Sequence, residues 1–396
     1  MSWPLVELGN VCSRVSVGHV GKTSEYYTDN SGVPFLRTQN VSKTGLELSD
    51  IKYVTNDFHS RLKKSQLVEG DVILSRVISS QINCAVIPPN FGEANCANII
   101  LARPTKELLD SKFLYYYLKS EFTQKELLKN QVGSAQSVVN TGVFKSWKIP
   151  LPPLEEQKRI AAILDKTDAI HQKRKQAIDL ADEFLRSVFL DMFGDPVTNP
   201  KGFQVGTIRD IVSKVNYGTS DKASETEGEF PILRMGNITY KGGWDFSDLK
   251  YIDLDDKDQG KYLARKNDLL FNRTNSKELV GKTAVFNESR PMAIAGYLIR
   301  VRTNELGNPW YISGYLNSSH GKQTLLNMCK SIVGMANINA QELQDINILL
   351  PPVELQNKYE SIVKEVNERV SRHHESVKEL QVLFNALSQK AFSGQL

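Results

Sequence analysis

The sequence predicts an α+β protein in which a domain of mixed strands and helices occurs twice, each time followed by one long helix. Three observations predict this fold: an internal repeat along the whole chain, a Pro-Pro pair at equivalent places in both copies, and a heptad pattern after each pair. Of the 396 residues, 40% are hydrophobic and 24% are charged. Such a composition is typical of a folded protein with enough chain for two or more cores.

The internal repeat has a period of about 200 residues, which is far longer than the roughly 20–50 residues of a solenoid unit. VPFLRTQNV at 33–41 recurs as FPILRMGNI at 230–238, and SDIKYV at 49–54 recurs as SDLKYI at 247–252. KIPLPPLEEQ at 148–157 recurs as NILLPPVELQ at 347–356. The order of the matches is never broken, which indicates a duplicated domain and connector. A duplicated fold without shared function is the competing interpretation, but the repeated polar residues are ones that a core does not require.

Each copy divides at its Pro-Pro pair, Pro152-Pro153 or Pro351-Pro352, because proline ends a preceding element and is tolerated at a helix start. Short β-rich runs such as VILSRV and helical pieces such as FLYYYLKSEFTQKELL come before the first pair. We therefore expect a first domain at 1–150, a long helix at 151–194, a second domain at 195–349 and a second long helix at 350–396.

Both predicted helices carry apolar residues at alternating spacings of three and four, as a coiled-coil seam requires. Polar seam positions, including His171 and His373, fall near the middle of each helix, where they can fix the register. A metal site at these histidines is conceivable, but a partly exposed seam histidine is the simpler interpretation. The apolar seam residues are expected to be Ile160, Leu164, Ile178, Leu185, Val363, Val370, Val377 and Phe384.

Signatures of catalysis are missing from the sequence. GHVGKT at 18–23 lacks the first glycine of a phosphate-binding loop, since Ser16 stands there, and GKT at 281–283 lacks it at Ser276. IPPN, LPPL and LPPV do not fit the [DNS]-P-P-[YFW] tetrad of amino-methyltransferases, and DIK and DLK match only half of a metal-nuclease motif. We predict no catalytic residues and no enzyme activity; an enzyme with an unrecognised active site is an alternative.

Charge and cysteine content add few constraints. A formal charge of +4 permits nucleic-acid binding without requiring it. The four cysteines have irregular spacings, which favours reduced, buried thiols over a metal site. No apolar run reaches the roughly 18 residues of a membrane span, and the first residues lack a signal-peptide pattern. We therefore expect a cytoplasmic protein that has no membrane partner.

Turn-like blocks in both copies are rich in side chains that read DNA bases: Arg or Lys for guanine, Asn or Gln for adenine, and Ser or Thr for either. Some of these residues are identical in the two copies and indicate architectural or phosphate-directed roles. Others have diverged, so that two copies of one scaffold would read two different short sequences. For any single loop residue, a solvated surface group is the competing interpretation. The candidates in copy one are Lys22, Arg37, Gln39, Asn40, Arg76, Ser79, Ser80, Gln81, Asn83, Ser134, Gln136 and Asn140. The candidates in copy two are Arg234, Asn237, Arg273, Thr274, Asn275, Ser276, Lys277, Lys282, Asn337 and Asn339. Phosphate contacts, which position without specifying sequence, are expected from Lys22, Lys145, Lys148, Lys277 and Lys282.

The whole chain resembles the specificity subunits of type I restriction–modification systems. The resemblance is carried by the duplicated PLPPLEEQ and LLPPVELQ boundaries, the long helix after each, ILRMGNI, DLLFNRTNSKELVGK and the closing LSQKAFSGQL. It implies two α/β target-recognition domains in a pseudo-twofold arrangement, separated by two long antiparallel coiled-coil helices. Each domain would read one half of a split, asymmetric site on double-stranded DNA, and the helices would set the spacer and dock partner subunits.

The resemblance also implies the partners: two adenine-N6 methyltransferase subunits and motor-nuclease restriction subunits. S-adenosylmethionine, ATP and magnesium would belong to those partners, and this chain would have no cofactor of its own. The mixed-charge outer faces of the two predicted helices suit a second contact, although a solvated face is the simpler interpretation. A coiled-coil adaptor that binds only protein is the alternative from another functional class.

Overall fold

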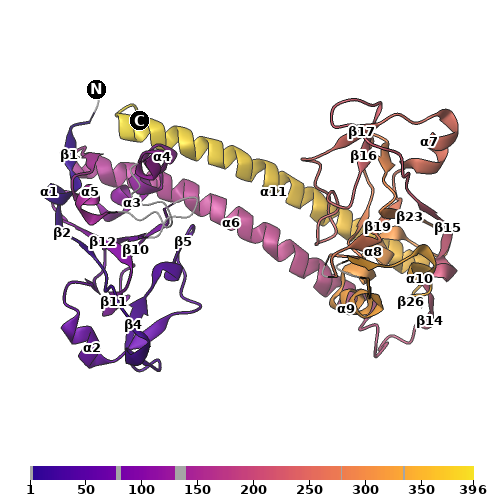
Figure 1. Cartoon of the computed structure of the whole chain (residues 1–396), viewed down its shortest axis with the longest axis horizontal. Coiled ribbons are helices and arrows are strands. Elements are labelled where there is room, and N and C mark those ends of the chain that lie inside the picture. The colour runs from indigo at the N-terminus through magenta and orange to yellow at the C-terminus, as the bar shows by residue number, and fades with distance from the viewer. Residues whose placement is uncertain (1–2, 77–81, 130–139, 278, 333–334) are drawn as a thin grey trace. The chain divides into compact units, whose positions relative to one another are not determined.

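The computed structural model describes residues 3–76, 82–129, 140–277, 279–332 and 335–396, which form two compact units (Figure 1). Unit 1 comprises residues 1–174 and 375–396, and unit 2 comprises residues 175–374. The chain passes between the units inside two long helices, α6 (Leu154–Phe193) and α11 (Val353–Ser393). The division therefore falls within both helices and not at their ends, where the sequence places the domain boundaries.

Unit 1 contains two main sheets. An antiparallel sheet has the strand order β10-β9-β12-β2, and a mixed sheet has the order β3-β7-β4-β11-β8, in which β4 and β11 run parallel. β1 pairs with β13, and β5 pairs with β6. The strands are β1 (Leu5–Glu7), β2 (Cys12–Val17), β3 (Tyr27–Thr28), β4 (Val33–Leu36), β5 (Val41–Ser42), β6 (Gly45–Leu46), β7 (Lys52–Val54), β8 (Gln66–Leu67), β9 (Val72–Ser75), β10 (Cys84–Val86), β11 (Ala94–Cys96), β12 (Ile99–Pro104) and β13 (Lys148–Pro150). The short helices are α1 (Leu8–Val11), α2 (Asn56–Arg61), α3 (Ser111–Lys119), α4 (Glu121–Lys129) and α5 (Thr141–Lys145).

Unit 2 repeats this plan. Its antiparallel sheet has the order β15-β23-β19-β21, and its mixed sheet has the order β17-β16-β22-β18 with β16 parallel to β22. β14 pairs with β26, and a further sheet has the order β20-β25-β24. The strands are β14 (Gln204–Thr207), β15 (Val212–Tyr217), β16 (Phe230–Leu233), β17 (Lys250–Ile252), β18 (Leu263–Ala264), β19 (Leu269–Asn272), β20 (Thr274–Asn275), β21 (Thr283–Val285), β22 (Met292–Ile294), β23 (Leu298–Thr303), β24 (Lys330–Ile332), β25 (Met335–Asn337) and β26 (Asn347–Leu350). The short helices are α7 (Asp256–Tyr262), α8 (Pro309–Asn317), α9 (Ser319–Met328) and α10 (Ala340–Gln344).

Strands β9 and β19 are buried on both faces, which explains their continuous apolar sequences. Successive side chains of a strand point to opposite faces. Val72 and Leu74 accordingly join the core around α3, whereas Ile73 joins a second core with the mixed sheet. In unit 2, Leu269 and Leu270 divide between two cores in the same way. Each antiparallel sheet is thus the central layer of its unit.

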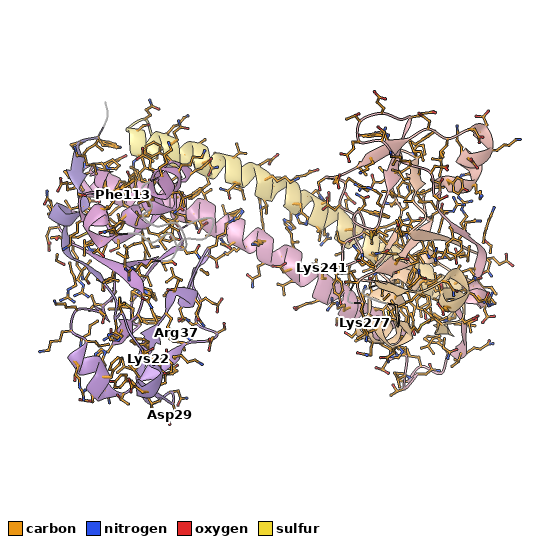
Figure 2. All side chains as sticks on the ribbon, in the orientation of Figure 1. Lys22, Asp29, Arg37, Phe113, Lys241 and Lys277 are labelled. Atoms are coloured by element: carbon orange, nitrogen blue, oxygen red, sulfur yellow. The ribbon has the colours of Figure 1, made fainter. Side chains whose placement is uncertain are left out.

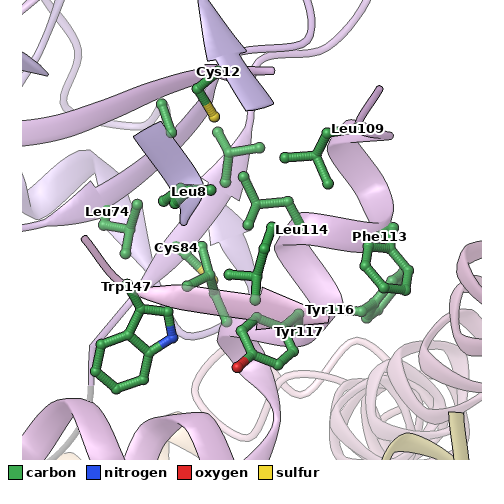
Figure 3. Close-up of a cluster of buried hydrophobic side chains, with 14 of the residues drawn as sticks. Leu8, Cys12, Leu74, Cys84, Leu109, Phe113, Leu114, Tyr116, Tyr117 and Trp147 are labelled. Carbon is green, nitrogen blue, oxygen red and sulfur yellow. The ribbon is translucent and has the colours of Figure 1, made fainter. Parts of the chain in front are cut away.

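The core around α3 brings together residues that lie far apart in the chain (Figure 3). Leu8, Leu74, Phe113 and Trp147 contribute to it, and so do residues of both long helices. The four cysteines are free thiols, as the sequence indicates, and burial raises the pKa of Cys84 to about 12. These thiols therefore pack as small apolar groups.

The two long helices contact one another within each unit. In unit 1, Ile160 and Leu164 near the start of α6 share a core with Phe384 and Ala391 near the end of α11. In unit 2, the end of α6 meets the start of α11, where the ring of Phe193 lies 5.5 Å from that of Tyr359. The helices therefore run antiparallel in both units. Of the expected seam residues, Ile160, Leu164, Val363 and Phe384 are buried, and Ile178, Leu185, Val370 and Val377 are half-buried.

Neither long helix, nor any other helix in the described ranges, has the length and the apolar composition that a membrane span requires.

Candidate nucleic-acid interface

The loop after β4 and its equivalent after β16 hold the four candidates that are identical in both copies. Arg37 donates from Nη2 to the backbone carbonyl of Asp50 at 2.7 Å and pairs with its carboxylate at 2.9 Å. Arg234 makes the same two contacts with Asp248, each at 2.9 Å. Both arginines therefore close a loop within their own unit.

The buried side chains of Asn40 and Asn237 form hydrogen bonds with the backbone of these loops. Asn40 is 1% exposed; its Oδ1 accepts from the backbone N–H of Arg37, and its Nδ2 donates to the carbonyl of Glu47 at 2.8 Å. Asn237 is 3% exposed and bonds in the same pattern to Arg234 and the backbone of its own loop. Because their side chains are buried and bonded, the two asparagines hold these loops together, which favours a structural role over the predicted contact with DNA.

Several exposed polar groups surround the first of these loops. Gln39 is exposed and donates to the carboxylate of Asp50 at 2.7 Å. Lys52 pairs with the same carboxylate at 3.0 Å, and these hydrogen bonds keep the pKa of Asp50 below its usual range. Asp50 and Lys52 are thus a local ion pair in a hydrogen-bonded turn. Figure 2 shows Lys22 and Arg37 in the same part of unit 1, away from Phe113.

Lys22 is exposed, and Lys222 is its equivalent in unit 2, which the alignment of the two repeats did not identify. Each lysine follows a glycine that ends a strand, Gly18 after β2 and Gly218 after β15. A Cβ at Gly18 would lie 2.6 Å from the carbonyl oxygen of Cys96, so the glycine serves a close backbone approach. The candidate phosphate contacts in this region are therefore a pair, one lysine in each unit.

The loop after β19 carries the diverged candidates of copy two. Its backbone pairs with β25, and Asn337 donates from Nδ2 to Oγ1 of Thr274 at 2.8 Å. Thr274 is buried, which favours a structural role over the predicted DNA contact. Asn275, Ser276 and Asn337 are half-buried, and Lys277 is exposed. The labelled Lys277 can be followed in Figure 2.

Arg273 lies at the base of this loop against an aromatic ring. Its guanidinium carbon is 4.7 Å from the ring centroid of Tyr217, which is itself partly exposed. The backbone of Arg273 accepts from the N–H of Ile338 and donates to the carbonyl of Tyr297. A guanidinium that is held against a ring has fewer conformations to lose when it meets a guanine edge. Tyr217 and Tyr297 are exposed at this site, and an aromatic residue at the end of β15 is the sequence signal that could have identified the first.

Three further candidates have structural roles. Lys282 is 7% exposed and donates from Nζ to the carbonyl of Met235 at 2.7 Å, so its ammonium group already makes one structural contact. Asn140 caps α5 by accepting from the N–H of Gly142, and Asn339 caps α10 by accepting from Gln341 and Glu342. Both asparagines are N-cap residues, and their assignment to base reading stays a prediction.

Only some of the remaining candidates of copy one lie within the described residues. Arg76 is half-buried, and Asn83 donates from Nδ2 to the carbonyl of Val41 at 3.1 Å. Lys145 and Lys148 are exposed near the end of unit 1's last strand pair. Ser79, Ser80, Gln81, Ser134 and Gln136 lie outside the described residues.

A cavity of about 460 Å³ in unit 2 contains the side chains that most resemble a catalytic set: His320, Glu342 and Asp345. Asp345 pairs with Arg209 at 2.6 Å, and this contact lowers the pKa of the carboxyl group. Glu342 accepts from the backbone N–H of Asn339 and completes a capping box. Each carboxylate therefore has a structural role. Within the described ranges, no group of three or more His, Cys, Asp or Glu residues could hold a metal ion.

Comparisons with known proteins agree with the duplicated architecture. The family model of the type I restriction modification DNA specificity domain matches residues 2–180 and again residues 200–381. The EcoKI specificity subunit of Escherichia coli (strain K12) is 23% identical over 100% of this chain and 89% of that protein. The StySPI specificity subunit of Salmonella potsdam is 22% identical over 93% of this chain and 84% of that protein.

A solved structure shows the same fold. The crystal structure of the type I restriction-modification S subunit from M. genitalium superposes with a TM-score of 0.62 at 15% identity, covering 99% of this chain and 96% of that one. Because the family model matches both copies, this chain belongs to the family of type I restriction–modification DNA specificity subunits and carries the DNA specificity domain twice.

Proposed function

We propose that each unit of this chain reads one half of a split, asymmetric DNA site and that the chain directs partner subunits to that site. This proposal is supported mainly by a contrast between the two copies: the loops closed by Arg37 and Arg234 have the same contacts, whereas the loops after Arg76 and Arg273 differ in sequence. Arg37 and Arg234 make the same contacts in the two units. The sequences that follow Arg76 and Arg273 differ in length and match only at Ser79 and Ser276. One frame that presents two different loops suits two different half-sites.

The side chains available in unit 2 are of the kind that read base edges in the major groove. Arg273 presents a planar fork for guanine, and Asn275 presents an amide for adenine. Lys277 is exposed next to them and supplies a positive charge for the backbone. In unit 1, Gln39 and Lys22 offer the corresponding exposed amide and positive charge.

The partners in this proposal are two adenine-N6 methyltransferase subunits, with motor-nuclease restriction subunits joining a complete complex. Apolar side chains on the long helices support a docking role. Leu180 and Phe184 on α6 are 51% and 52% exposed, and Val382 on α11 is 70% exposed. Exposed apolar residues at helical spacing favour contact with a partner helix. The helices would also set the unread gap between the half-sites.

Catalysis belongs to the partners in this proposal, and so do S-adenosylmethionine, ATP and magnesium. The structural use of Glu342 and Asp345 in the cavity of unit 2 supports a non-catalytic chain. A cytoplasmic location, where such partners and DNA would be met, is part of the same proposal.

Co-expression with a cognate adenine-N6 methyltransferase subunit, followed by methylome sequencing, tests the proposal. The expected result is adenine methylation at one asymmetric motif with two specified halves and an unspecified gap. A continuous palindrome would contradict two different readers. DNA affinity that falls steeply with salt is also expected, because phosphate contacts release counterions. An affinity that does not depend on salt would favour a protein-only adaptor, and methylation or cleavage by the isolated chain would reveal an enzyme.

A further inference from the structure

Lys322, near the start of α9, is a buried cation whose charge is opposed by two further cations of unit 2. Lys322 of this helix has a buried Nζ without a hydrogen-bond partner in the described structure, 4.8 Å from the ring centroid of Tyr240. The charged groups that act on Lys322 in the described ranges are Lys282 and Arg186, and both are cations. Lys282 is buried, whereas Arg186 on α6 is exposed. An ammonium group in this position lacks both a counter-charge and an acceptor.

The nearby carboxylates are engaged elsewhere. Asp182 of α6 pairs with Lys241 at 2.5 Å, and Asp179 lies 4.0 Å from the same ammonium group. Lys241, labelled in Figure 2, comes from the loop after β16, and electrostatic repulsion from Arg186 acts on it. Asp179 and Asp182 carry two negative charges against the one positive charge of Lys241, so the remaining negative charge lies on the same face as Arg186. In the described ranges, no carboxylate pairs with Lys322 or Lys282, and these two charges stay uncompensated.

Burial and the neighbouring charges change the pKa values of Lys322 and Lys282. Burial and the two neighbouring cations lower the pKa of Lys322 to about 8, and burial lowers the pKa of Lys282. Removing an ammonium group from water disfavours its charged form unless a partner compensates. A bound anion would supply that partner.

Unit 1 shows that the fold does not need these charges. Gln124 stands where Lys322 stands in unit 2; its Oε1 accepts from the N–H of Ile82, and its Nε2 donates to the carbonyls of Ile82 and Leu118. Asn83 replaces Lys282 and donates to the carbonyl of Val41.

The third position follows the same rule. Asn385 of α11 replaces Arg186 and donates to the carboxylate of Glu121 at 3.1 Å. All three positions are neutral and hydrogen-bonded in unit 1, and all three are cationic in unit 2. The charges therefore serve something other than packing.

We propose that Lys322, Lys282 and Arg186 form a phosphate-binding site of unit 2 that receives a backbone phosphate of bound DNA. The inference rests on the proposed DNA-reading function and adds a contact to it. Lys282 ends the loop that begins at Arg273, so the site adjoins the candidate base-reading residues along the chain. Arg186 can donate two parallel hydrogen bonds to a phosphate. Tyr240, which is 51% exposed, covers the ammonium group and would turn aside when the phosphate enters.

The test replaces each cation by the neutral residue of unit 1: Lys322→Gln, Lys282→Asn and Arg186→Asn in the full chain, with its methyltransferase partner. DNA affinity is measured by fluorescence anisotropy on the methylome-derived duplex over a series of KCl concentrations. Loss of one phosphate contact should reduce the slope of log affinity against log salt by about 1. The preferred bases in both half-sites should not change, because phosphate contacts carry no sequence information. Lys257→Gln, an exposed lysine of α7, should leave the slope as in the wild-type protein.

A pH series separates a direct contact from a structural role. If phosphate holds Lys322 in its charged form, DNA binding takes up a proton above about pH 8, and wild-type affinity should fall by up to about tenfold per pH unit. This loss should be absent in Lys322→Gln. Equal pH profiles in the two proteins would overturn the site. Thermal unfolding of the free variants is expected to be unchanged or shifted upward, because a buried, unpaired charge is removed.

Further measurements distinguish a DNA phosphate from a small phosphate ligand. They also distinguish failure of this site from failure of the proposed DNA-binding function. Calorimetry with inorganic phosphate on the DNA-free protein should show at most weak binding. Tight binding that Lys322→Gln abolishes, together with an unchanged DNA salt slope, would replace the DNA phosphate by a small phosphate ligand and overturn the proposal. A wild-type protein without salt-dependent DNA affinity would refute the proposed function itself. Salt-dependent binding with the same slope in all variants would refute only this site.

Discussion

Gln356 accepts a hydrogen bond of 2.8 Å through Oε1 from the backbone N–H of Asn308, and Gln157 accepts the equivalent bond from Asp110 at 2.9 Å. The amide group of Gln356 also donates to the carbonyls of Leu306 and Pro351. Both glutamines have no exposed surface. The last residue of the repeated Pro-Pro motif thus joins the start of each long helix to the loop before α3 or α8.

Replacement of Gln356 by alanine should destabilise unit 2. The change removes three hydrogen bonds and leaves buried backbone groups of Asn308 and Pro351 unpaired, which should lower the free energy of unfolding by about 3 kcal/mol. Urea denaturation followed by tryptophan fluorescence measures this value. Gln389→Ala, at an exposed position on α11, should stay within about 0.5 kcal/mol of the wild type. Equal effects of the two substitutions would contradict the role of the buried carboxamide.

Asn237 should act on stability and not on base preference. Asn237→Ala leaves the N–H of Arg234 and the carbonyl of Asp245 without their partner and removes one of two donors to the carbonyl of Asp248, so we expect a loss of about 2 kcal/mol in the free energy of unfolding. Methylome sequencing should find the wild-type motif, methylated less completely. Gln39→Ala provides the comparison, because this side chain is exposed and its change should hardly affect stability. A changed motif in Asn237→Ala would restore the asparagine as a base-reading residue.

Arg273 and the residues after it should determine one half of the motif. Arg273→Ala removes a guanidinium that is oriented by Tyr217 and should cost about 1–3 kcal/mol of binding at one specified base pair. Joint replacement of Asn275 and Ser276 should change the same half of the motif. Arg76→Ala in unit 1 is the matched control and should affect only the other half. If a substitution in one unit altered both halves, the assignment of units to half-sites would be wrong.

Local signals in the sequence predicted the parts of the fold that depend on local chemistry. α6 and α11 begin directly after Pro153 and Pro352, because proline fits the first turn of a helix but cannot continue the strand before it. The repeat predicted that the two copies share a topology, and β4–β11 and β16–β22 are parallel pairs at equivalent places. The division of the compact units inside the helices depends on contacts between distant residues, which periodicity does not reveal.

The sequence alone does not reveal which of the candidate site residues are buried. Asn40 and Lys282 are polar residues in turn-like sequence, and nothing in their neighbours along the chain shows that tertiary contacts cover them. Asn339 carried a readable signal, since Glu342 stands three residues later at the other position of a capping box. Tyr217 ends a strand, and its contact with Arg273 joins residues that are distant in sequence. Residues that are identical in the two copies therefore indicated shared intramolecular contacts more reliably than shared contacts with DNA.

The stability of unit 2 should depend on pH through Lys322. Its pKa falls from an ordinary value of 10.5 to about 8 in the folded protein, because the ammonium group is buried beside Lys282 and Arg186. Between pH 8 and 10.5 the unfolded chain binds more protons at this residue than the folded chain, so this contribution to the free energy of unfolding rises with pH. The slope is at most about 1.4 kcal/mol per pH unit.

Urea denaturation at pH 7, 8, 9 and 10 measures this effect as a difference between wild type and Lys322→Gln, since other groups titrate equally in both proteins. The variant should be the more stable protein at pH 7, and its advantage should shrink as the pH rises above 8. Lys257→Gln should give a curve parallel to that of the wild type, because this lysine is exposed. A constant difference between Lys322→Gln and wild type would show that the ammonium group keeps its ordinary acidity. In that case an internal partner already compensates its charge, and unit 2 has no need of a phosphate at this position.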